Sequence, residues 1–482
     1  SASSSLTLRT IVLLYSLYNF LNEFLYIYCI FRNEFLYYYY IFLEEFMKRS
    51  AYSTLFEWKN GKNRKPLLLQ GARQVGKTYL VDTFAKNEYS EYADFNFEKS
   101  PDLSIIFDGD LDPRTIISKL SLFIGRKISP DNPLVFFDEI QICPRAITSL
   151  KYFAEEAPEY HIIAAGSLLG VSVGKKSSFP VGKVNFMTLY PLSFSEFLDA
   201  SGDGLLAEMI SAGRLDELGD VFHNKLAEKL KLYLYLGGMP EVLHSYFENT
   251  DIAEARKIQN EILISYKNDF SKYTATDQAV KTAEVWDSIP YQLSRENKKF
   301  TYTGVTKKAR GSTHSLTITW LKNAGLVYPS YHVPVPKIPL TGYSDKTKFK
   351  LYLCDTGLLG AMLGLTSDII LKPDAIFADY NGAFIENFVA SELVNTFGYE
   401  LYYWSSEGKA EVDFLIQRGS QIYHAEVKSG SSRNLKSLRV YEGKYEPERV
   451  IRISPRIFSR EKEFYNIPLY GVAGLENLIG NR

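Results

Sequence analysis

Short apolar runs separated by amphipathic stretches dominate the chain between residues 60 and 200. Apolar runs of this length are typical of buried strands, and apolar residues three or four positions apart are typical of helices. The predicted strands are residues 67–70, 92–98, 134–138, 161–165 and 184–189. Strands that alternate with helices form parallel sheets covered by helices on both faces, so the pattern predicts an α/β fold. Ligands bind such sheets at the carboxyl ends of the strands.

After residue 200 the apolar residues take helical spacing, for example at Phe222, Leu226 and Leu230, which predicts helices over residues 205–273. The sequence GGMP at residues 237–240 predicts a break among them. Farther on, the predicted elements are a helix capped by Ser312 that stops near Gly325, a strand over 326–331, a helix over 383–397, and two strands over 411–416 and 422–428.

Residues 71–78, GARQVGKT, follow the first predicted strand and fit the phosphate-loop pattern GxxxxGK[ST]. In such a loop, backbone N–H groups and the start of a helix face phosphate oxygens. Lys77 brings a positive charge to the β- and γ-phosphates, and Thr78 offers a hydroxyl to Mg²⁺. The residues predicted to contact ATP here are Gly71, Ala72, Arg73, Gln74, Val75, Gly76, Lys77, Thr78 and Tyr79.

Two acids end the apolar run that begins at Pro133. Asp138 is predicted to hold the Mg²⁺ of bound ATP, and Glu139 to orient and deprotonate the attacking water. Lys77 and Glu139 are therefore the predicted catalytic residues of ATP hydrolysis. Ser167, at the end of the next strand, is predicted to contact the γ-phosphate, with a simple turn as the alternative.

Composition narrows the class of protein. The chain has 482 residues, 46% hydrophobic and 23% charged, as in a folded soluble protein. A net charge of −1 excludes a uniformly basic nucleic-acid coat. Three widely spaced cysteines favour a reducing, cytoplasmic location, and six scattered histidines without HExxH disfavour a zinc enzyme.

Residues 1–46 are rich in Tyr, Phe, Leu, Ile and Asn, but charges divide them into apolar pieces shorter than the ~20 residues of a membrane-spanning helix. The first methionine is Met47. We expect this segment to lie upstream of the native start, with no stable membrane association. An interfacial anchor is the alternative.

Five sequences in order, GARQVGKT, FFDEIQ (136–141), AAGSLLG (164–170), LYPLSFSEFL (189–198) and LGGMPEVL (236–243), resemble the prokaryotic AAA-type ATPases that carry a C-terminal domain of unknown function. The resemblance implies that GGMP lies near the ATP site. It also implies an arginine finger at the position of Lys183, where a lysine supplies charge without the planar fork. Arg73 and Arg145 stay open as alternative fingers, and both an oligomer and a monomer stay open. The sequence DTGLL at residues 355–359 also matches this family and predicts a turn that caps a helix.

The predicted domains are an N-terminal extension (1–46), an AAA-type core (47–200), a helical lid (201–275), a winged helix (276–340) and a PD-(D/E)XK nuclease-like domain (341–482). DNA contact is predicted through residues 295–325 and the C-terminal domain, because six basic residues precede the capped helix that would enter the major groove. They are Arg295, Lys298, Lys299, Lys307, Lys308 and Arg310. The alternative is a winged helix that serves as a protein–protein spacer.

The two predicted strands after residue 410 carry acids at alternating positions. If they pair as a hairpin across Arg418 and Gly419, Asp413 lies opposite His424 and Glu411 lies opposite Glu426. Side chains two positions apart share a face, so one face is predicted to carry Glu411, Asp413, His424, Glu426 and Lys428. Carboxylates gathered in this way repel one another unless a cation lies among them.

The spacing D…ExK resembles the PD-(D/E)XK nuclease fold. The resemblance implies that Asp413 and Glu426 hold Mg²⁺ and that Lys428 positions or activates water for phosphodiester hydrolysis. Glu386 is the predicted additional catalytic glutamate from the preceding helix, with Glu392 as the alternative. An inherited fold with surface ion pairs and no cleavage is the other interpretation.

These observations predict a cytoplasmic, multidomain ATPase that uses ATP and Mg²⁺. In the favoured hypothesis, the nucleotide state gates nucleic-acid binding or Mg²⁺-dependent cleavage by the C-terminal domain. The alternatives are an ATP-driven switch that holds a protein or DNA partner without cleavage, and a membrane-associated ATPase that uses residues 1–46.

Overall fold

Five parallel strands form the sheet of the N-terminal half, in the order β2-β3-β4-β1-β5. They are β1 (Leu67–Gln70), β2 (Glu91–Asn96), β3 (Pro133–Asp138), β4 (His161–Gly166) and β5 (Asn185–Thr188). This computed structural model describes residues 47–130, 133–167, 180–273, 276–295, 298–367, 381–406, 410–430, 436–445, 447, 449–461 and 464–480. The predicted parallel sheet is confirmed. The segment 1–46 and residues 168–170 of AAGSLLG lie outside the described residues.

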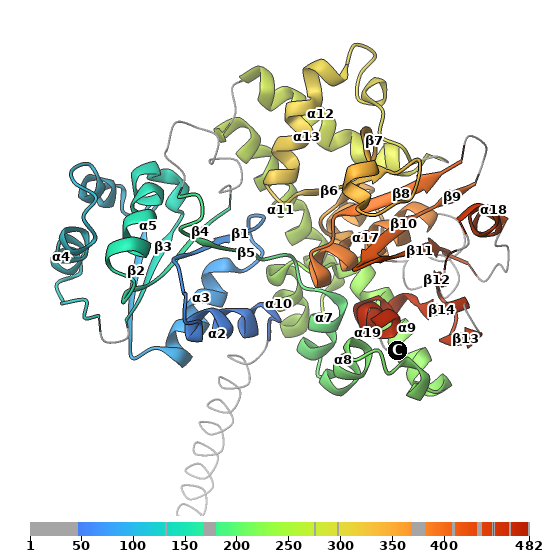
Figure 1. Cartoon of the computed structure of the whole chain (residues 1–482), viewed down its shortest axis with the longest axis horizontal. Coiled ribbons are helices and arrows are strands. Elements are labelled where there is room, and N and C mark those ends of the chain that lie inside the picture. Colours follow the sequence, from blue (N-terminus) through green and yellow to red (C-terminus); the bar gives the residue numbers. More distant parts are fainter. Residues whose placement is uncertain are drawn as a thin grey trace, which may run out of the picture. The chain divides into compact units, whose positions relative to one another are not determined.

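Alternate side chains of the strands face two layers of helices. Phe95, Phe137 and Ile162 pack in one core with α4 (Pro113–Ile124) and α5 (Pro144–Glu156). The opposite face is covered by α2 (Ala51–Asn60) and α3 (Lys77–Glu88) (Figure 1). All six residues of β3 are buried, as expected of a strand covered on both faces.

Helices follow the sheet, as the periodicity predicts. They are α7 (Phe194–Ala200), α8 (Gly204–Ser211), α9 (Asp220–Leu236), α10 (Pro240–Asn249) and α11 (Ile252–Tyr273). The GGMP sequence separates α9 from α10, which confirms the predicted break. A Cβ on Gly76 of the phosphate loop would lie 3.5 Å from the Pro240 side chain, so this break is next to the loop, as the resemblance implies.

Three segments that are far apart in the sequence meet at this break. The Leu192 N–H donates to the Gly238 carbonyl oxygen at 2.7 Å, and the Gly238 N–H donates to Asp355 Oδ2 at 2.6 Å. Asp355 also accepts from the Leu358 N–H at 2.8 Å, which confirms the predicted cap on α14 (Thr356–Met362). A Cβ on Gly237 would lie 2.3 Å from Asp355 Oδ1, and one on Gly238 would lie 2.1 Å from the Leu192 carbonyl oxygen. We refer to these contacts as the motif junction.

Two helices and an antiparallel hairpin follow, and the winged-helix prediction rests on the second helix and the strand after it. The elements are α12 (Thr276–Leu293), α13 (Gly311–Asn323), β6 (Val327–His332) and β7 (Asp345–Leu353). The predicted cap at Ser312 is wrong: α13 begins at Gly311, and the Arg310 N–H donates to Thr313 Oγ1 at 3.3 Å. Strand β6 also pairs with β8 (Leu401–Ser405), and β8 pairs with β9 (Glu411–Val412), so the hairpin belongs to a sheet ordered β7-β6-β8-β9.

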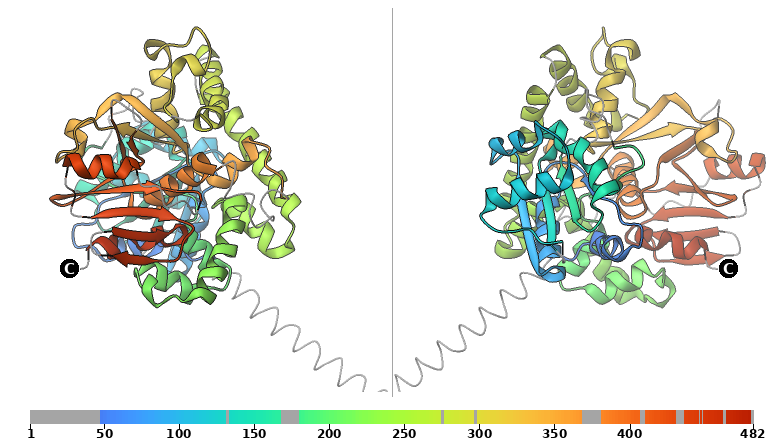
Figure 2. Two further views of the ribbon diagram at one scale, coloured as in Figure 1. Left: turned by 90° about the vertical axis from the view of Figure 1, so that its right-hand side faces the viewer. Right: turned by 60° about the vertical axis from the view of Figure 1, so that its left-hand side comes forward.

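The C-terminal region adds a second five-stranded sheet, β10-β11-β12-β14-β13. Its strands are β10 (Phe414–Arg418), β11 (Gln421–Val427), β12 (Val450–Ser454), β13 (Ser459–Glu461) and β14 (Phe464–Pro468). The helices are α17 (Asn381–Phe397), α18 (Lys436–Tyr445) and α19 (Leu475–Gly480). Figure 2 shows the strands side by side, with α18 at one end. In the part of the chain that the structure describes, no helix has the length and apolar character needed to cross a membrane.

The hairpin β10–β11 differs in register from the prediction. Arg418 pairs with Gln421, so the turn consists of Gly419 and Ser420 rather than Arg418 and Gly419. Gly419 has a φ of +57°, the left-handed conformation that two-residue hairpin turns require at this position.

The register change moves His424 away from its predicted partner. Leu415, not Asp413, lies opposite His424, and Asp413 falls in the break between β9 and β10. The His424 side chain is fully buried, with its ring centroid 4.8 Å from that of Tyr441. The prediction that His424 shares the charged face is therefore wrong: it packs in an aromatic core.

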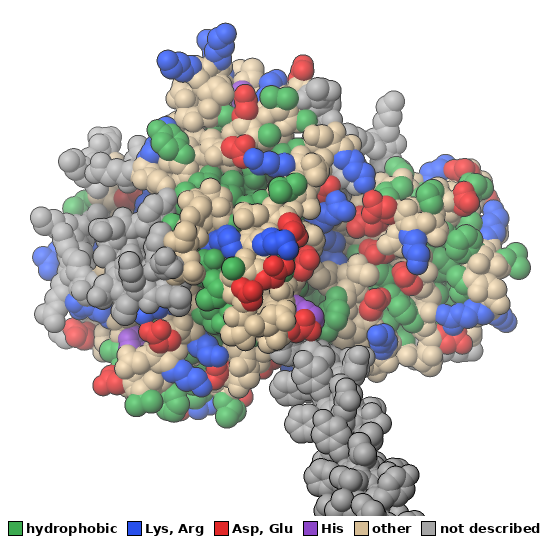
Figure 3. All heavy atoms as spheres, turned by 180° about the vertical axis from the view of Figure 1, so that it is seen from behind, with side chains coloured by type: hydrophobic (Ala, Val, Ile, Leu, Met, Phe, Trp, Pro, Cys, Tyr) green, Lys and Arg blue, Asp and Glu red, His purple; other side chains and the backbone are tan. Residues whose placement is uncertain are grey.

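Only half of the predicted basic run faces solvent. Lys307, Lys308 and Arg310 are exposed, and Figure 3 shows Lys and Arg side chains at the upper end, where Figure 1 labels α12 and α13. The other three contact neighbouring groups: Arg295 donates to Thr301 Oγ1, Lys299 to Ser405 Oγ and Lys298 to Glu386.

Candidate nucleotide site

The phosphate loop connects the carboxyl end of β1 to the first residue of α3. Its backbone has φ values of +152° at Gly71, +64° at Gln74 and +91° at Gly76. A Cβ on Gly71 would lie 2.2 Å from the Leu189 carbonyl oxygen, so only glycine fits. The loop therefore turns sharply into a helix start whose free N–H groups and dipole favour an anion.

Lys77 is 7% exposed and curls back on the loop. Its ammonium donates to the carbonyl oxygens of Gly71 at 3.1 Å and Ala72 at 2.8 Å. Burial lowers the pKa of Lys77 to about 8, although the nearby Glu139 and Asp138 carboxylates oppose this change. The lysine is thus held at the loop with its charge only partly compensated.

Asp138 and Thr78, the predicted metal ligands, are hydrogen-bonded to each other. Thr78 Oγ1 donates to Asp138 Oδ2 at 3.1 Å, and Asn96 Nδ2 donates to the same oxygen at 3.0 Å. Burial raises the pKa of Asp138, and these two hydrogen bonds oppose the increase. Hydroxyl and carboxylate oxygens are the ligands that Mg²⁺ prefers, so the pair fits the metal. Asn96 was not predicted, because it reaches the site from β2 only through the strand order.

Glu139 directly follows Asp138 and has a φ of +51°. Such a backbone costs about 1–3 kcal/mol in a residue other than glycine and is typical of functional sites that their surroundings hold in place. Its carboxylate accepts a hydrogen bond from the Gln141 side chain, and burial raises its pKa. Glu139 therefore lies at the end of β3, one residue beyond Asp138, the predicted metal ligand.

The other predicted contacts are distributed around the loop. Ala72 and Val75 are buried, Tyr79 is 49% exposed, and Ser167 is 7% exposed at the end of β4, which lies between β1 and β3. All three candidates for the arginine-finger position make contacts within the chain: Arg73 with Asp269 at 2.7 Å, Arg145 with the Gly109 carbonyl at 2.6 Å, and Lys183 with Glu155 at 2.9 Å.

The outer face of the phosphate loop packs against the second half of the chain. The Tyr266 hydroxyl on α11 donates to the Arg73 carbonyl oxygen at 2.9 Å, and the Arg73 guanidinium pairs with Asp269 on the same helix. A Cβ on Gly325, in the turn between α13 and β6, would lie 3.1 Å from the Ala72 nitrogen. The loop is therefore held from outside by α11 and by the turn that ends α13.

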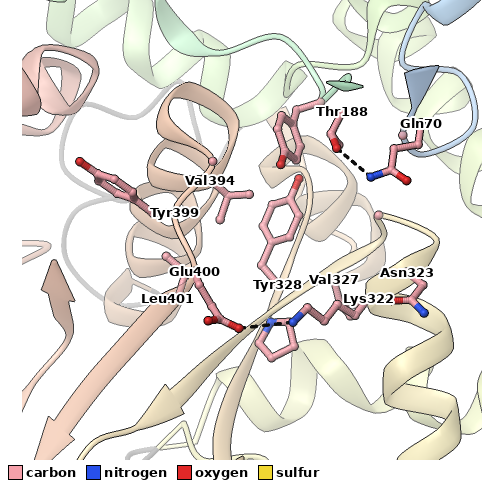
Figure 4. Close-up of a pocket in the computed structure, with 15 residues that line it drawn as sticks. Gln70, Thr188, Lys322, Asn323, Val327, Tyr328, Val394, Tyr399, Glu400 and Leu401 are labelled. Carbon is pink, nitrogen blue, oxygen red and sulfur yellow. Dashed lines mark hydrogen bonds and ion pairs between the residues drawn. The ribbon is translucent and has the colours of Figure 1, made fainter. Parts of the chain in front are cut away.

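A cavity of about 340 Å³ lies beside this contact (Figure 4). Gln70 and Thr188, joined at 3.0 Å, line it from the ends of β1 and β5. Lys322 at the end of α13 and Glu400 before β8 line the other side, with 3.6 Å between their charged atoms. Since the lining comes from distant segments, local sequence patterns give no sign of it.

In the C-terminal region, Glu386 and Asp413 are brought together around a lysine that was not predicted. The Lys350 ammonium lies 2.7 Å from Glu386 Oε1, 2.5 Å from Glu411 Oε1 and 3.6 Å from Asp413 Oδ1. The Lys350 side chain is fully buried. The cation that gathered carboxylates require is therefore present as part of the chain.

The remaining predicted residues lie nearby but pair differently. Lys428 and Glu426 pair with each other at 2.5 Å, and the Val427 N–H donates to Asp413 Oδ2 at 2.8 Å. Glu392 lies elsewhere, since its carboxylate accepts from the Phe194 N–H at 2.9 Å, so it is not an alternative to Glu386. Among the described residues, no three His, Cys, Asp or Glu side chains are grouped so that they could hold a metal ion.

The pKa of Lys77 leads to a prediction about nucleotide affinity. Phosphate oxygens stabilise the charged ammonium, so binding must take up a proton once the pH exceeds about 8. The dissociation constant for Mg·ATP is expected to rise by about tenfold between pH 7 and pH 9, a range in which phosphate, with a second pKa of about 6, is already ionised. Titration calorimetry measures this. Lys77→Arg is the control, because its charge does not change in this range, and an equally steep rise in this variant would contradict the assignment.

Three family models match separate parts of the chain. An AAA domain matches residues 63–198, a domain of unknown function (DUF8612) matches residues 227–369, and another (DUF4143) matches residues 381–470. The first match, the phosphate loop and the five-stranded parallel sheet together define an AAA-type P-loop ATPase domain. The protein is an ATPase.

Solved structures give remote similarities. A Walker-type ATPase of Pyrococcus abyssi, PABY2304, is 13% identical over 66% of this chain and 96% of its own, with a TM-score of 0.42. The Aeropyrum pernix ORC1 protein, in complex with DNA, is 12% identical over 65% of this chain and 90% of its own, with a TM-score of 0.27. The Thermotoga maritima RuvB branch migration motor is 15% identical over 62% of this chain and 92% of its own, with a TM-score of 0.28. No curated protein matches the chain.

Proposed function

We propose that this ATPase is a nucleotide-driven switch in which the state of the phosphate loop controls nucleic-acid binding by the region around α13. One observation carries the proposal: the outer face of the loop contacts α11 and the turn that ends α13. A change in the loop on nucleotide binding or hydrolysis therefore acts on one end of α13, and the exposed basic residues precede the other end of this helix.

In this proposal the backbone of residues 71–78 and Lys77 hold the triphosphate, and Thr78 and Asp138 hold Mg²⁺. The metal supplies charge neutralisation at the β- and γ-phosphates when it is bound. Glu139 orients the attacking water and accepts its proton, and Ser167 contacts the γ-phosphate from β4. The Arg73–Asp269 ion pair connects this centre to α11, since Arg73 belongs to the loop that grips the phosphates.

The binding surface is assigned to Lys307, Lys308 and Arg310, which are exposed before and at the start of α13. Side chains on the exposed face of this helix are mostly short and polar, with Leu316 as an exposed apolar residue among them; the polar ones include Ser312, Thr313, Ser315 and Thr319. Cations contribute salt-dependent affinity through phosphate contacts, while short polar side chains tolerate close approach to a groove. A nucleic acid therefore matches this surface better than an apolar protein partner.

Replacing Lys307, Lys308 and Arg310 together with glutamine tests the proposal. Duplex DNA affinity, measured by fluorescence anisotropy, is expected to fall, and the log–log salt slope to become less steep by about 0.9 for each phosphate that the protein no longer neutralises. Glutamine at Arg114, Lys119 and Lys127, which are exposed on and after α4, is the charge-matched control. Equal decreases in affinity in both triple variants would contradict the assigned surface.

The switch itself is tested by Asp269→Asn. This change removes the ion pair to Arg73 but leaves the predicted phosphate and metal ligands intact. DNA affinity is expected to differ between the Mg·ATP and Mg·ADP states of the unmodified chain, and this difference is expected to shrink in the variant. Lys267→Gln, which removes the exposed ion pair with Asp287, is the control on the same helix. A nucleotide effect of unchanged size in Asp269→Asn would argue against this route.

Mg²⁺-dependent cleavage at Asp413, Glu426, Lys428 and Glu386 is the rival function. It is supported by the hydrogen bond that places Asp413 beside the strand of the ExK sequence. If this site cuts nucleic acid, alanine at Asp413 or Lys428 abolishes cutting and spares ATP hydrolysis. Cutting at an unchanged rate in either variant would refute that assignment.

A further inference from the structure

A charge cluster with Lys350 and Glu386 at its buried centre joins four segments of the C-terminal half. Its members are Lys298 before α13, Lys350 on β7, Glu386 on α17, Glu411 on β9 and Asp413 after β9. The Lys350 ammonium occupies the middle, within 2.5–3.6 Å of one oxygen from each carboxylate. The Tyr403 ring lies over the same ammonium, 5.2 Å from it, so cation–π attraction adds to the ion pairs.

Both carboxylate oxygens of Glu386 are paired with groups of the chain. One oxygen accepts from Lys350 and from the Tyr352 hydroxyl, and the other pairs with Lys298. Burial raises the pKa of Glu386, but Lys298 and Lys350 reverse this and lower it to about 2. The carboxylate is therefore ionised and satisfied by groups of the chain itself.

A divalent metal would need the place that Lys350 occupies. Mg²⁺ requires near-octahedral oxygen ligands at about 2.0–2.1 Å, and an ammonium among the same carboxylates repels it. Lys350 cannot simply withdraw, because its side chain is fully buried and removing it from its partners would leave an unpaired charge in the interior. Glu426, the other predicted ligand, has Lys428 at 2.5 Å. These residues therefore do not fit the Mg²⁺ site that the D…ExK resemblance implies.

We propose that Lys350 is the resident cation of this cluster, that the C-terminal domain needs no divalent metal, and that the cluster anchors the segment before α13 through Lys298. Lys298 has a φ of +47°, and its ammonium pairs with Glu386. In this arrangement the cluster holds Lys298, which precedes the exposed basic residues, and does not form a metal centre.

Removing Lys350 is expected to convert the cluster into a divalent site. With Lys350→Met, the cluster keeps three carboxylates and one ammonium, that of Lys298 on Glu386, so one divalent ion brings its formal charge to zero. The experiment uses full-length protein without nucleotide, with Asp138→Asn in every variant to remove the phosphate-loop metal site. Mn²⁺ binding is measured by calorimetry and by the electron paramagnetic resonance signal of free Mn²⁺.

The chain that retains Lys350 is expected to bind no Mn²⁺ at the cluster. Lys350→Met is expected to gain a Mn²⁺ site with a dissociation constant of about 10⁻⁴–10⁻³ M or lower, where that range is typical of weak divalent sites. The added change Asp413→Asn is expected to remove this site. Lys428→Met is the matched control, because this lysine also pairs with a carboxylate of the predicted nuclease motif; it is expected to gain no site. Lys298→Met is expected to speed amide exchange over residues 298–310.

Mn²⁺ binding by the chain with Lys350 intact, abolished by Asp413→Asn, would overturn the proposal, and this measurement does not require the Lys350 variant to fold. A site gained in Lys428→Met but not in a folded Lys350→Met variant would also overturn it. Neither measurement involves ATP or nucleic acid, so the outcome is independent of the proposed switch.

Discussion

Replacement of Glu139 with glutamine is expected to lower kcat for ATP hydrolysis by about 10²–10⁴-fold, the contribution typical of general acid–base catalysis. Glutamine keeps the size of the side chain and can still orient a water molecule, but it cannot accept a proton. Asp138, Thr78 and Lys77 remain in place, so the affinity for Mg·ATP is expected to stay nearly unchanged. A loss confined to kcat is the signature of an interaction used in the transition state.

Phosphate release at saturating Mg·ATP measures kcat, and calorimetry with the variant measures affinity. Glu98→Gln is the matched control, since Glu98 also follows a strand of the same sheet but forms an exposed ion pair with Lys272 at 3.0 Å. It is expected to retain activity. Turnover that is equal in Glu139→Gln and Glu98→Gln would remove Glu139 from the role of base.

Replacement of Glu386 with alanine is expected to lower the free energy of unfolding by about 3–5 kcal/mol, the cost of breaking a buried ion pair on one side. The change leaves the ammonium groups of Lys350 and Lys298 without their shared partner and the Tyr352 hydroxyl without its acceptor. Because Glu411 and Asp413 still face Lys350, we expect the loss in unfolding free energy to match the removal of one buried partner and not of the whole cluster.

Urea unfolding followed by circular dichroism measures this loss. Glu400→Ala is the control, because its ion pair with Lys322 is 3.6 Å long with both side chains more than 40% exposed; such pairs contribute at most about 1 kcal/mol. A loss of about 1 kcal/mol or less in Glu386→Ala, no larger than that in Glu400→Ala, would mean that water reaches the cluster and screens its charges.

The nucleotide site could be predicted because its signals are contiguous. The loop lies between one strand and one helix, and Asp138 ends an apolar strand, so local patterns locate both. Asn96 escaped prediction because only the order of β2 and β3 in the sheet brings it to Asp138. The contact between Arg73 and Asp269 joins residues 196 positions apart, and no local pattern encodes it.

Lys350 shows why the C-terminal prediction was incomplete. It continues an alternation in which Lys346 and Lys348 are exposed, so the sequence presents it as another solvent-facing residue of an edge strand. Burial by α17 and β9 reverses this expectation. The predicted hairpin register was wrong for a different reason. Gly419 can occupy either central position of a two-residue turn, and only the observed pairing of Arg418 with Gln421 decides between the two registers.

The motif junction has a consequence for divergent relatives of this chain. A side chain at position 237 collides with the carboxylate of Asp355, while a backbone amide at position 238 is the partner of that same carboxylate. A substitution in the glycine pair or at Asp355 is thus tolerated only with a matching substitution at the other site. In a family alignment the glycine pair and the aspartate should vary together or stay fixed together, although 117 positions separate Gly238 from Asp355.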